Sequence, residues 1–165
     1  MKSTPGKIQT VAELKPVVQR LQEGGKTVVW TNGCFDILHV GHVMYLDKAA
    51  REGDVLVVGL NSDASVRRLK GPDRPIVPES ERAFVLAALE CVDYVTIFSE
   101  PTPERILEDL KPDVYAKGGD YTIDSIVQEE RRIVEGYGGR IAIISGVEGK
   151  STTAIIGRIL EERGV

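Results

Sequence analysis

Cysteine is scarce in this sequence, which has 165 residues but only two cysteines, Cys34 and Cys91. Two cysteines cannot build a disulfide framework, and without a Cys-x-x-Cys pair neither a standard zinc knuckle nor a dithiol redox site is predicted. The scarcity of cysteine therefore predicts a protein of the reducing cytoplasm.

Long apolar runs and an excess of positive charge are also missing. No segment approaches the roughly 18 apolar residues that a membrane span needs, and the N-terminal residues lack the apolar core of an export signal. Lys and Arg number 21 against 25 Asp and Glu, which gives a net charge of −4. We therefore expect no nucleic-acid or membrane partner, and we expect any bound anion to meet a local group of cations.

Aromatic residues make up only 5% of the chain, whereas glycine is abundant, with 17 residues. A hydrophobic share of 42% beside 28% charged residues is typical of a globular protein and excludes disordered and fibrous classes. The length fits one compact domain, which we expect to span residues 1–165.

Short runs of β-branched and aromatic residues alternate with segments of helical apolar spacing. The runs predict strands at 27–31, 55–60, 94–98, 114–117 and 140–144. The helical spacing predicts helices at 11–22, 40–51, 79–89, 103–110, 128–136 and 151–162. This alternation predicts a single doubly wound α/β domain, with a five-stranded, mostly parallel sheet and helices on both faces.

Polar and glycine-rich segments follow four of the predicted strands. They span 32–42, 61–74, 117–121 and 146–153. Because ligands of such folds bind at the carboxyl ends of the strands, we expect these four loops to converge on one ligand site.

The first of these loops contains both histidines of the chain, His39 and His42. Positions three apart at the start of a helix lie on the same side, so both imidazoles can face one ligand. Gly41 lets a bulky group approach the backbone, and the N-terminus of the helix attracts phosphate. The loop therefore predicts a phosphoryl site where the imidazoles stabilise developing charge.

The histidine pair also fits two different roles. One is a metal site with Cys34 and Asp36, although this spacing matches no standard zinc pattern. The second is a structural pair that caps the helix.

Two segments carry a resemblance to a known family. His-x-Gly-His at 39–42, preceded by Gly-x-Phe-Asp at 33–36, resembles the signature of the nucleotidylyltransferase superfamily, which includes glycerol-3-phosphate cytidylyltransferase and pantetheine-phosphate adenylyltransferase. The segment 146–153 resembles the cytidylyltransferase motif Arg-Thr-Glu-Gly-Ile-Ser-Thr-Thr at the start of the last helix. Gly146 stands at the place of the family's arginine, and Lys150 is a candidate for the missing cation.

Within this superfamily the chain is most similar to the adenylyltransferases of bacterial ADP-heptose synthesis. The similarity extends through segments 61–66, 69–75, 81–82 and 117–121. It implies transfer of an adenylyl group from ATP to D-glycero-D-manno-heptose 1-phosphate, giving ADP-heptose and pyrophosphate for lipopolysaccharide or a related glycan. It also implies Mg²⁺ bound with ATP, no tightly bound protein metal, a homodimer, and a separate heptose kinase that supplies the sugar phosphate.

The resemblance implies three groups of site residues. The reacting phosphates would be contacted by His39, His42 and Lys70. The nucleotide would be contacted by Cys34 through its backbone, Phe35, His39, Gly41, His42, Lys117, Gly118, Asp120, Gly149, Ser151, Thr152 and Thr153. The sugar phosphate would be contacted by Asp36, Asn61, Asp63 and Arg82.

Several of these residues could instead have a purely structural role. Ser62 or Asp63 could cap a helix at 64–69, and Ser151 and Thr152 could be an ordinary cap.

Basic residues in and after the second loop also allow two interpretations. Arg67 and Arg68 fit a solvated charged face, whereas we expect Lys70 to contact phosphate. Arg82 could form an ion pair with Glu79 instead of contacting substrate.

Three alternative functions remain at this point. One is a CTP-dependent cytidylyltransferase that acts on a small phosphorylated alcohol or a phosphonate. Another is a non-catalytic module that binds ATP without releasing pyrophosphate. A fragment of an aminoacyl-tRNA synthetase is disfavoured, because the net charge is unsuited to tRNA.

Overall fold

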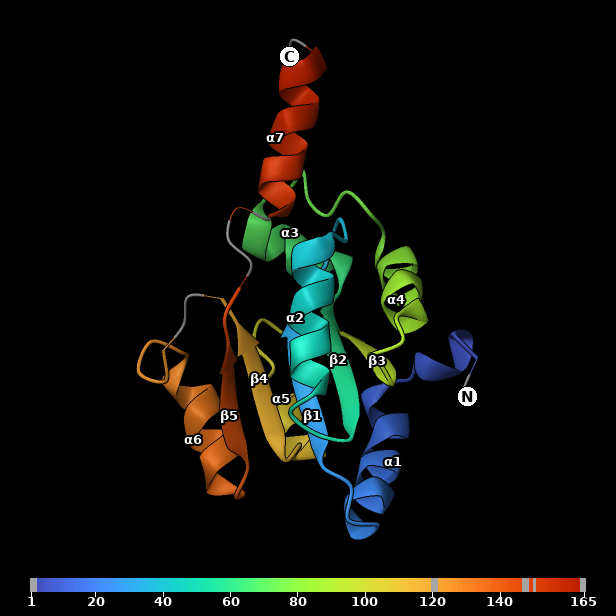
Figure 1. The fold of residues 1–165 in the computed structure, drawn as a ribbon, viewed down its shortest axis with the longest axis vertical. Helices are drawn as coiled ribbons and strands as arrows, with labels where there is room; N and C mark the ends of the chain where they lie inside the picture. Colours follow the sequence, from blue (N-terminus) through green and yellow to red (C-terminus); the bar gives the residue numbers. More distant parts are fainter. Residues whose placement is uncertain (1–2, 120–121, 147–148, 150, 164–165) are drawn as a thin grey trace.

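The computed structural model of the protein describes residues 3–119, 122–146, 149 and 151–163. Its five strands form one sheet in the order β3-β2-β1-β4-β5, and all neighbouring strands are parallel (Figure 1). The strands are β1 Val28–Gly33, β2 Val55–Asn61, β3 Tyr94–Phe98, β4 Val114–Gly118 and β5 Arg140–Ile144. The predicted open α/β fold is therefore confirmed.

Seven α-helices connect or flank these strands in the described part of the chain. They are α1 Val11–Glu23, α2 Val40–Ala50, α3 Asp63–Lys70, α4 Glu79–Ala88, α5 Glu104–Leu110, α6 Gln128–Gly136 and α7 Thr152–Arg163. Each predicted helix bound is within one residue of these, whereas the short 3₁₀ helix η1 Pro5–Lys7 was not predicted. Among the described residues, no helix is both long and apolar enough to cross a bilayer.

Helices cover both faces of the sheet because successive strand residues point to opposite sides. On one side, Val29 of β1 belongs to a core cluster with Leu46 of α2 and Leu86 of α4. On the other, Trp30 belongs to a second cluster with residues of α1, α5 and α6: Leu14, Val18, Leu107 and Val134. This two-sided burial explains why β2 and the first half of β1 are almost continuously apolar.

The order of the strands places a crevice beside β1. From β1 the chain moves outward through β2 to β3, and it then returns to the other side of β1 to form β4 and β5. The direction of winding thus reverses at β1, which is where ligands of parallel α/β sheets bind.

Strand β1 is two residues longer than predicted at its carboxyl end. Asn32 and Gly33 continue the parallel register opposite Gly59 and Leu60 of β2. The consequence is that Asn32 is fixed by the sheet rather than by a loop.

Helix α7 lies beyond the carboxyl edge of the sheet and extends away from it, as Figure 1 shows in red. Its first residues approach the start of α2, where Thr152 Oγ1 lies 3.5 Å from the carbonyl oxygen of Ile37. Two helix N-termini, those of α2 and α7, therefore lie at the same edge.

Candidate active site

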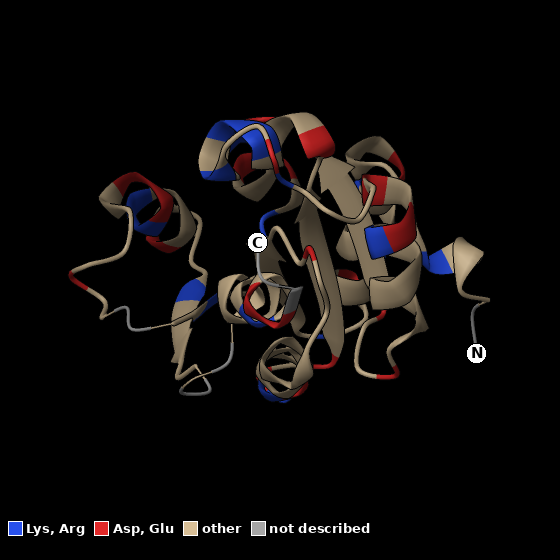
Figure 2. Cartoon of the chain, turned by 90° about the horizontal axis from the view of Figure 1, so that it is seen from above, with Lys and Arg blue, Asp and Glu red and all other residues tan. Residues whose placement is uncertain are grey.

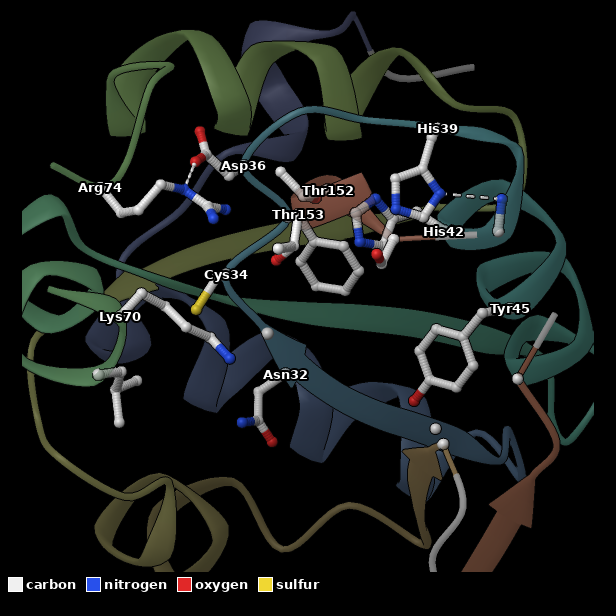
Figure 3. Close-up of a pocket in the computed structure, with 18 residues that line it drawn as sticks. Asn32, Cys34, Asp36, His39, His42, Tyr45, Lys70, Arg74, Thr152 and Thr153 are labelled. Atoms are coloured by element: carbon white, nitrogen blue, oxygen red, sulfur yellow. Dashed lines mark hydrogen bonds and ion pairs between the residues drawn. The ribbon is translucent and has the colours of Figure 1, made fainter. Parts of the chain in front are cut away.

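A pocket of about 600 Å³ opens at the carboxyl ends of β1 and β4. Its walls come from the loop after β1, the start of α2, the end of α3, the end of β4 and the start of α7 (Figure 3). The lining comprises Asn32, Gly33, Cys34, Phe35, Asp36, His39, Gly41, His42, Tyr45, Leu69, Lys70, Arg74, Gly118, Gly119, Gly146, Ser151, Thr152 and Thr153. Each of the four loops expected to converge, 32–42, 61–74, 117–121 and 146–153, thus contributes described residues to this pocket.

His39 is the N-cap of α2. Its Nδ1 accepts a hydrogen bond from the backbone N–H of Gly41 at 3.1 Å, so a neutral His39 carries its hydrogen on Nε2. The ring stacks on that of His42, with centroids 3.8 Å apart and 23° between the planes. The cap and the stack are therefore one arrangement, and it holds both imidazoles at the pocket.

His42 lies between His39 and the edge of the Phe35 ring, whose centroid is 5.3 Å away. Burial, and secondly the charge of His39, lower the pKa of His42 to about 4. His42 is therefore neutral at pH 7. Its buried Nδ1 has no hydrogen-bond partner among the described residues, so the ring has capacity for a polar ligand.

The depressed pKa of His42 predicts a loss of stability in mild acid. The unfolded chain takes up a proton near the ordinary value of 6.5, whereas the folded chain resists it until about 4. Stability is therefore full above about pH 6.5, falls as the pH drops towards 4, and levels below that value. Between pH 7 and pH 4 we expect the wild type to lose about 1–2 kcal/mol of unfolding free energy more than His42→Gln loses, a value already reduced for partial solvent screening. Urea unfolding of both proteins across this pH range measures the difference. Parallel curves for the two proteins would contradict it.

The turn before the histidines is conformationally demanding. Phe35 has a φ of 43°, in the left-handed region that residues other than glycine avoid, and it is 6% exposed. Arg82 Nη1 donates to the carbonyl oxygen of the preceding Cys34 at 2.5 Å. This buried guanidinium helps to hold the turn in the conformation that brings Phe35 against His42.

Asp36 lines the pocket, but its carboxylate already has partners within the protein. The backbone N–H groups of Ile76 and Val77 donate to it at 2.9 Å, and Arg74 Nε lies 2.5 Å from Oδ2. Burial alone would raise the pKa of Asp36, but the N–H groups of Val77 and Ile76 and the Arg74 guanidinium outweigh it and hold the pKa below its ordinary value. Asp36 thus anchors the segment after α3 beside the pocket.

Three predicted substrate contacts lie outside the described pocket lining. Arg82, whose side chain is 0% exposed, pairs with Asp63 at 2.7 Å and also donates to the carbonyl oxygens of Asn61 and Val77. The Asn61 amide donates to Ser65 Oγ at 3.0 Å, and Ser62 caps α3. The structure therefore groups Asn61, Asp63 and Arg82 as a network behind the pocket. The alternative of an ion pair for Arg82 is met by Asp63 instead of Glu79.

Tyr45 lines the pocket, although its role was not predicted from the sequence. It follows His42 by three residues in α2, so helical spacing could have identified it. Its hydroxyl bonds Thr31 Oγ1 at 2.5 Å and donates to the carbonyl oxygen of Ala116 at 3.1 Å, and burial raises its pKa to about 12. Tyr45 thereby links α2 to β1 and β4 at the base of the pocket.

The ring of Tyr45 occupies the space where a side chain on Gly118 would be. A Cβ atom at Gly118 would lie 2.4 Å from Tyr45 Cε2, which is too close for any side chain. We expect Gly118→Ala to lower the free energy of unfolding by about 1–3 kcal/mol in urea titrations.

A second glycine-to-alanine variant controls for the general effect of replacing glycine by alanine. Gly136→Ala in α6 meets no atom within 4 Å and should change stability by no more than about 1 kcal/mol. Adding Tyr45→Leu to Gly118→Ala should restore part of the loss. An unchanged midpoint for Gly118→Ala would show that the ring moves at no cost.

Only one of the basic residues in the last turn of α3 reaches the pocket, and Arg68 donates to the carbonyl oxygen of Ser99 instead of lying free in solvent. The last turn of α3 carries Arg67, Arg68 and Lys70, visible as the blue segment of this helix in Figure 2. Of these, only Lys70 belongs to the described lining, and it makes no hydrogen bond or ion pair with another described residue. Figure 3 shows Lys70 and Arg74 reaching towards the pocket from the side opposite His39.

The start of α7 supplies hydroxyl groups to the pocket. Ser151, Thr152 and Thr153 line it, and Ser151 Oγ accepts a hydrogen bond from the N–H of Ala154 at 3.1 Å, as a cap does. The structure describes Gly149, whose φ is 70°, outside the lining. Asp120 and Lys150 lie outside the described residues.

Lys117 has a structural partner close to the pocket. Its Nζ lies 2.7 Å from Glu130 Oε2 of α6 and 5.0 Å from the centroid of the Tyr115 ring. Lys117 is absent from the described lining, whereas the neighbouring Gly118 belongs to it.

Acidic groups at the pocket do not form a metal site in the described residues. No group of three or more His, Cys, Asp or Glu side chains there could hold an ion. Asp36 is the one carboxylate of the described lining, and its oxygens face Arg74 and backbone N–H groups. A Mg²⁺ ion bound mainly by a triphosphate fits this lining, because such an ion needs few ligands from the protein.

A parallel sheet with paired imidazoles and two helix N-termini at its switch point defines a Rossmann-like domain of the nucleotidylyltransferase class. The chain belongs to the cytidylyltransferase-like family, whose model matches residues 30–158. The family resemblance predicted from the two motifs is thereby confirmed.

Similar curated proteins include two that carry the name bifunctional protein HldE. The protein of Syntrophotalea carbinolica is 57% identical over 155 residues, covering 94% of this chain and 31% of that protein. The protein of Geobacter metallireducens is 56% identical over 158 residues, covering 96% of this chain and 32% of that protein. This chain thus spans about a third of the length of these relatives.

Two solved structures resemble the fold. A lipopolysaccharide core biosynthesis protein from Thermoplasma volcanium GSS1 has a TM-score of 0.63 and 28% identity, over 76% of this chain and 100% of that chain. The pantoate-beta-alanine ligase of Francisella tularensis has a TM-score of 0.60 and 15% identity, over 94% of this chain and 77% of that chain. The second likeness concerns the fold alone.

Proposed function

We propose that the protein is an adenylyltransferase that joins ATP to D-glycero-D-manno-heptose 1-phosphate, giving ADP-heptose and pyrophosphate. The observation that carries this proposal is the stacked pair His39 and His42 in one pocket with the hydroxyl-rich start of α7. The resemblance to ADP-heptose adenylyltransferases names the substrates, and the Thermoplasma volcanium protein is named for lipopolysaccharide core biosynthesis.

In this reaction a phosphate oxygen of the sugar phosphate attacks the α-phosphorus of ATP in line. The new P–O bond forms as the bond from the α-phosphorus to the bridging oxygen of the β-phosphate breaks, and pyrophosphate leaves with that electron pair. The nucleophile is already an anion at pH 7, so no side chain has to remove a proton. Catalysis then requires positioning and stabilisation of charge, as in other phosphoryl transfers.

The pocket residues divide this work. His39 and His42 hydrogen-bond the α-phosphate as its charge grows, which is where a preorganised donor has the greatest effect. Lys70 and the segment Ser151–Thr153 hold the β- and γ-phosphates, and the backbone of Gly118 at the end of β4 contacts the nucleotide. Mg²⁺ arrives with ATP as part of the substrate and neutralises the triphosphate.

The second set of predicted contacts has a supporting role in this proposal. Arg82 and Asp63, together with Asn61, position the turn at Cys34 from behind rather than touch the sugar phosphate. Asp36 positions Arg74, whose guanidinium takes the sugar-phosphate contact predicted for Asp36. Lys117, paired with Glu130, supports the end of β4.

The surroundings of the enzyme form the remaining part of the proposal. We propose that residues 1–165 act as one nucleotidylyltransferase unit in the cytoplasm, as a homodimer, with a sugar kinase supplying the heptose 1-phosphate. Size measurement by light scattering tests the dimer.

Pyrophosphate release tests the reaction. ATP and CTP are each combined with heptose 1-phosphate, glycerol 3-phosphate and phosphoethanolamine, with Mg²⁺ present. Turnover only with ATP and heptose 1-phosphate is expected. Turnover with CTP and a small phosphorylated alcohol would replace the proposal by a cytidylyltransferase, and ATP binding without pyrophosphate release would indicate a non-catalytic module.

A further inference from the structure

A chain of four polar side chains runs from α6 through β4 to the end of β1, beneath the pocket. Tyr115 Oη lies 2.9 Å from Asn32 Oδ1 and 3.0 Å from Glu130 Oε2. Lys117 Nζ lies 2.7 Å from the same oxygen of Glu130. Tyr115 is fully buried and Glu130 almost so, whereas Asn32 reaches the pocket lining.

The carboxylate of Glu130 is the strongest acceptor in this chain of side chains. It is paired with Lys117, and it lies in the first turn of α6, where the helix dipole favours negative charge. A hydrogen bond to an ionised carboxylate is about twice as strong as one between neutral groups. The single hydrogen of the Tyr115 hydroxyl is therefore donated to Glu130.

Because the hydroxyl hydrogen of Tyr115 points to Glu130, Tyr115 Oη can only accept a hydrogen bond from Asn32. A carbonyl oxygen at 2.9 Å from the lone pairs of Tyr115 Oη would repel them, whereas an amide N–H would be bonded. The two ends of an asparagine amide have nearly the same shape, so a half-turn about the last side-chain bond exchanges them without steric cost.

We infer that Asn32 donates from Nδ2 to Tyr115 and turns its carbonyl oxygen towards the pocket. Asn32 then offers an acceptor to the ligand, which suits a hydroxyl hydrogen and repels phosphate oxygens. On the proposed function, this oxygen receives a hydroxyl group of the ribose or of the sugar phosphate. Asn32 is thereby a specificity residue, and Tyr115 and Glu130 are positioning residues that act through it.

The sequence contains only two asparagines, Asn32 and Asn61, which makes the orientation measurable. In ligand-free protein labelled with ¹⁵N-asparagine, the Asn32 NH₂ signals should show NOEs to the Tyr115 ring. In Tyr115→Phe, we expect these signals to shift and their hydrogens to exchange about tenfold faster, because one hydrogen bond is lost. The Asn61 signals are the control, since that amide bonds Ser65 Oγ at 3.0 Å, and they should stay unchanged.

If the Asn32 amide had the opposite orientation, with its NH₂ group facing the pocket, the NMR signals would behave differently. Absence of NOEs to Tyr115, or Asn32 NH₂ signals that gain protection from exchange when pyrophosphate is added, would overturn the inference. The NOE measurement needs wild-type protein only, so it stands even if Tyr115→Phe fails to fold. It also needs no turnover, so its failure and the failure of the proposed reaction are separate results.

Kinetics identify which substrate carries the hydroxyl. Asn32→Ala should raise KM about tenfold for one substrate and change kcat less, because the lost contact is made before the transition state. A raised KM for ATP identifies the ribose, and a raised KM for heptose 1-phosphate identifies the sugar. Unchanged KM values for both would overturn the role of Asn32 as an acceptor for substrate.

Discussion

Replacing His42 by alanine is expected to lower kcat about 100- to 1000-fold while the fold stays intact. This is the usual loss when one preorganised donor to a developing oxyanion is removed. His42 is held between His39 and Phe35 before any ligand arrives, so its hydrogen bond needs no rearrangement during the reaction. Pyrophosphate release at saturating ATP and heptose 1-phosphate measures the effect.

A neighbouring position provides the control for His42. Met44 lies in the same turn of α2, is 44% exposed and does not belong to the described lining. Met44→Ala should keep kcat within about twofold of wild type, since an exposed side chain outside the pocket contributes little. Full activity of His42→Ala, with circular dichroism unchanged, would show that the stacked histidines have a structural role only.

Replacing Arg82 by alanine is expected to cost about 3–5 kcal/mol of stability, the largest effect on folding among the variants considered. The guanidinium is fully buried and bonds the carbonyl oxygens of Cys34, Asn61 and Val77 as well as the carboxylate of Asp63. Alanine would leave these buried acceptors without donors, and each unpaired group carries a desolvation penalty. Urea unfolding gives the change in free energy.

Two further variants separate charge from geometry at Arg82. Arg82→Lys keeps the positive charge but cannot reach several carbonyls at once, so it should recover only part of the loss. Arg105→Ala removes an exposed arginine of α5 and should change stability by no more than about 0.5 kcal/mol. A small effect of Arg82→Ala would mean that water replaces the guanidinium and that the turn at Phe35 is held by other contacts.

The alternation of strands and helices could be predicted because it is written in local periodicity. The runs at β3 and β5 and the amphipathic segment at α6 have the bounds expected from apolar spacing alone. The end of β1 could not be predicted in this way. Asn32 and Gly33 have low strand propensity, and only their register opposite β2 makes them part of the sheet.

The histidine motif was visible in the sequence because its residues are neighbours in the chain. Lys70 was identified by its place in a basic segment, and the structure brings it to the same pocket. Arg82 was expected at the ligand, because the family resemblance implies a substrate contact at this position. Its burial depends on carbonyl groups from three separate segments, and no local pattern reports such an arrangement.

By itself, the sequence determined the α/β class, the family motifs and the charged residues available to meet an anion, because these depend on residue type and spacing. Only the tertiary structure decided which polar groups face a ligand and which face one another. Asn32, Tyr115 and Glu130 are far apart in the chain, yet they share two hydrogen-bond contacts beneath the pocket. The direction of a hydrogen bond depends on all groups around it, and those groups meet only when the sheet forms.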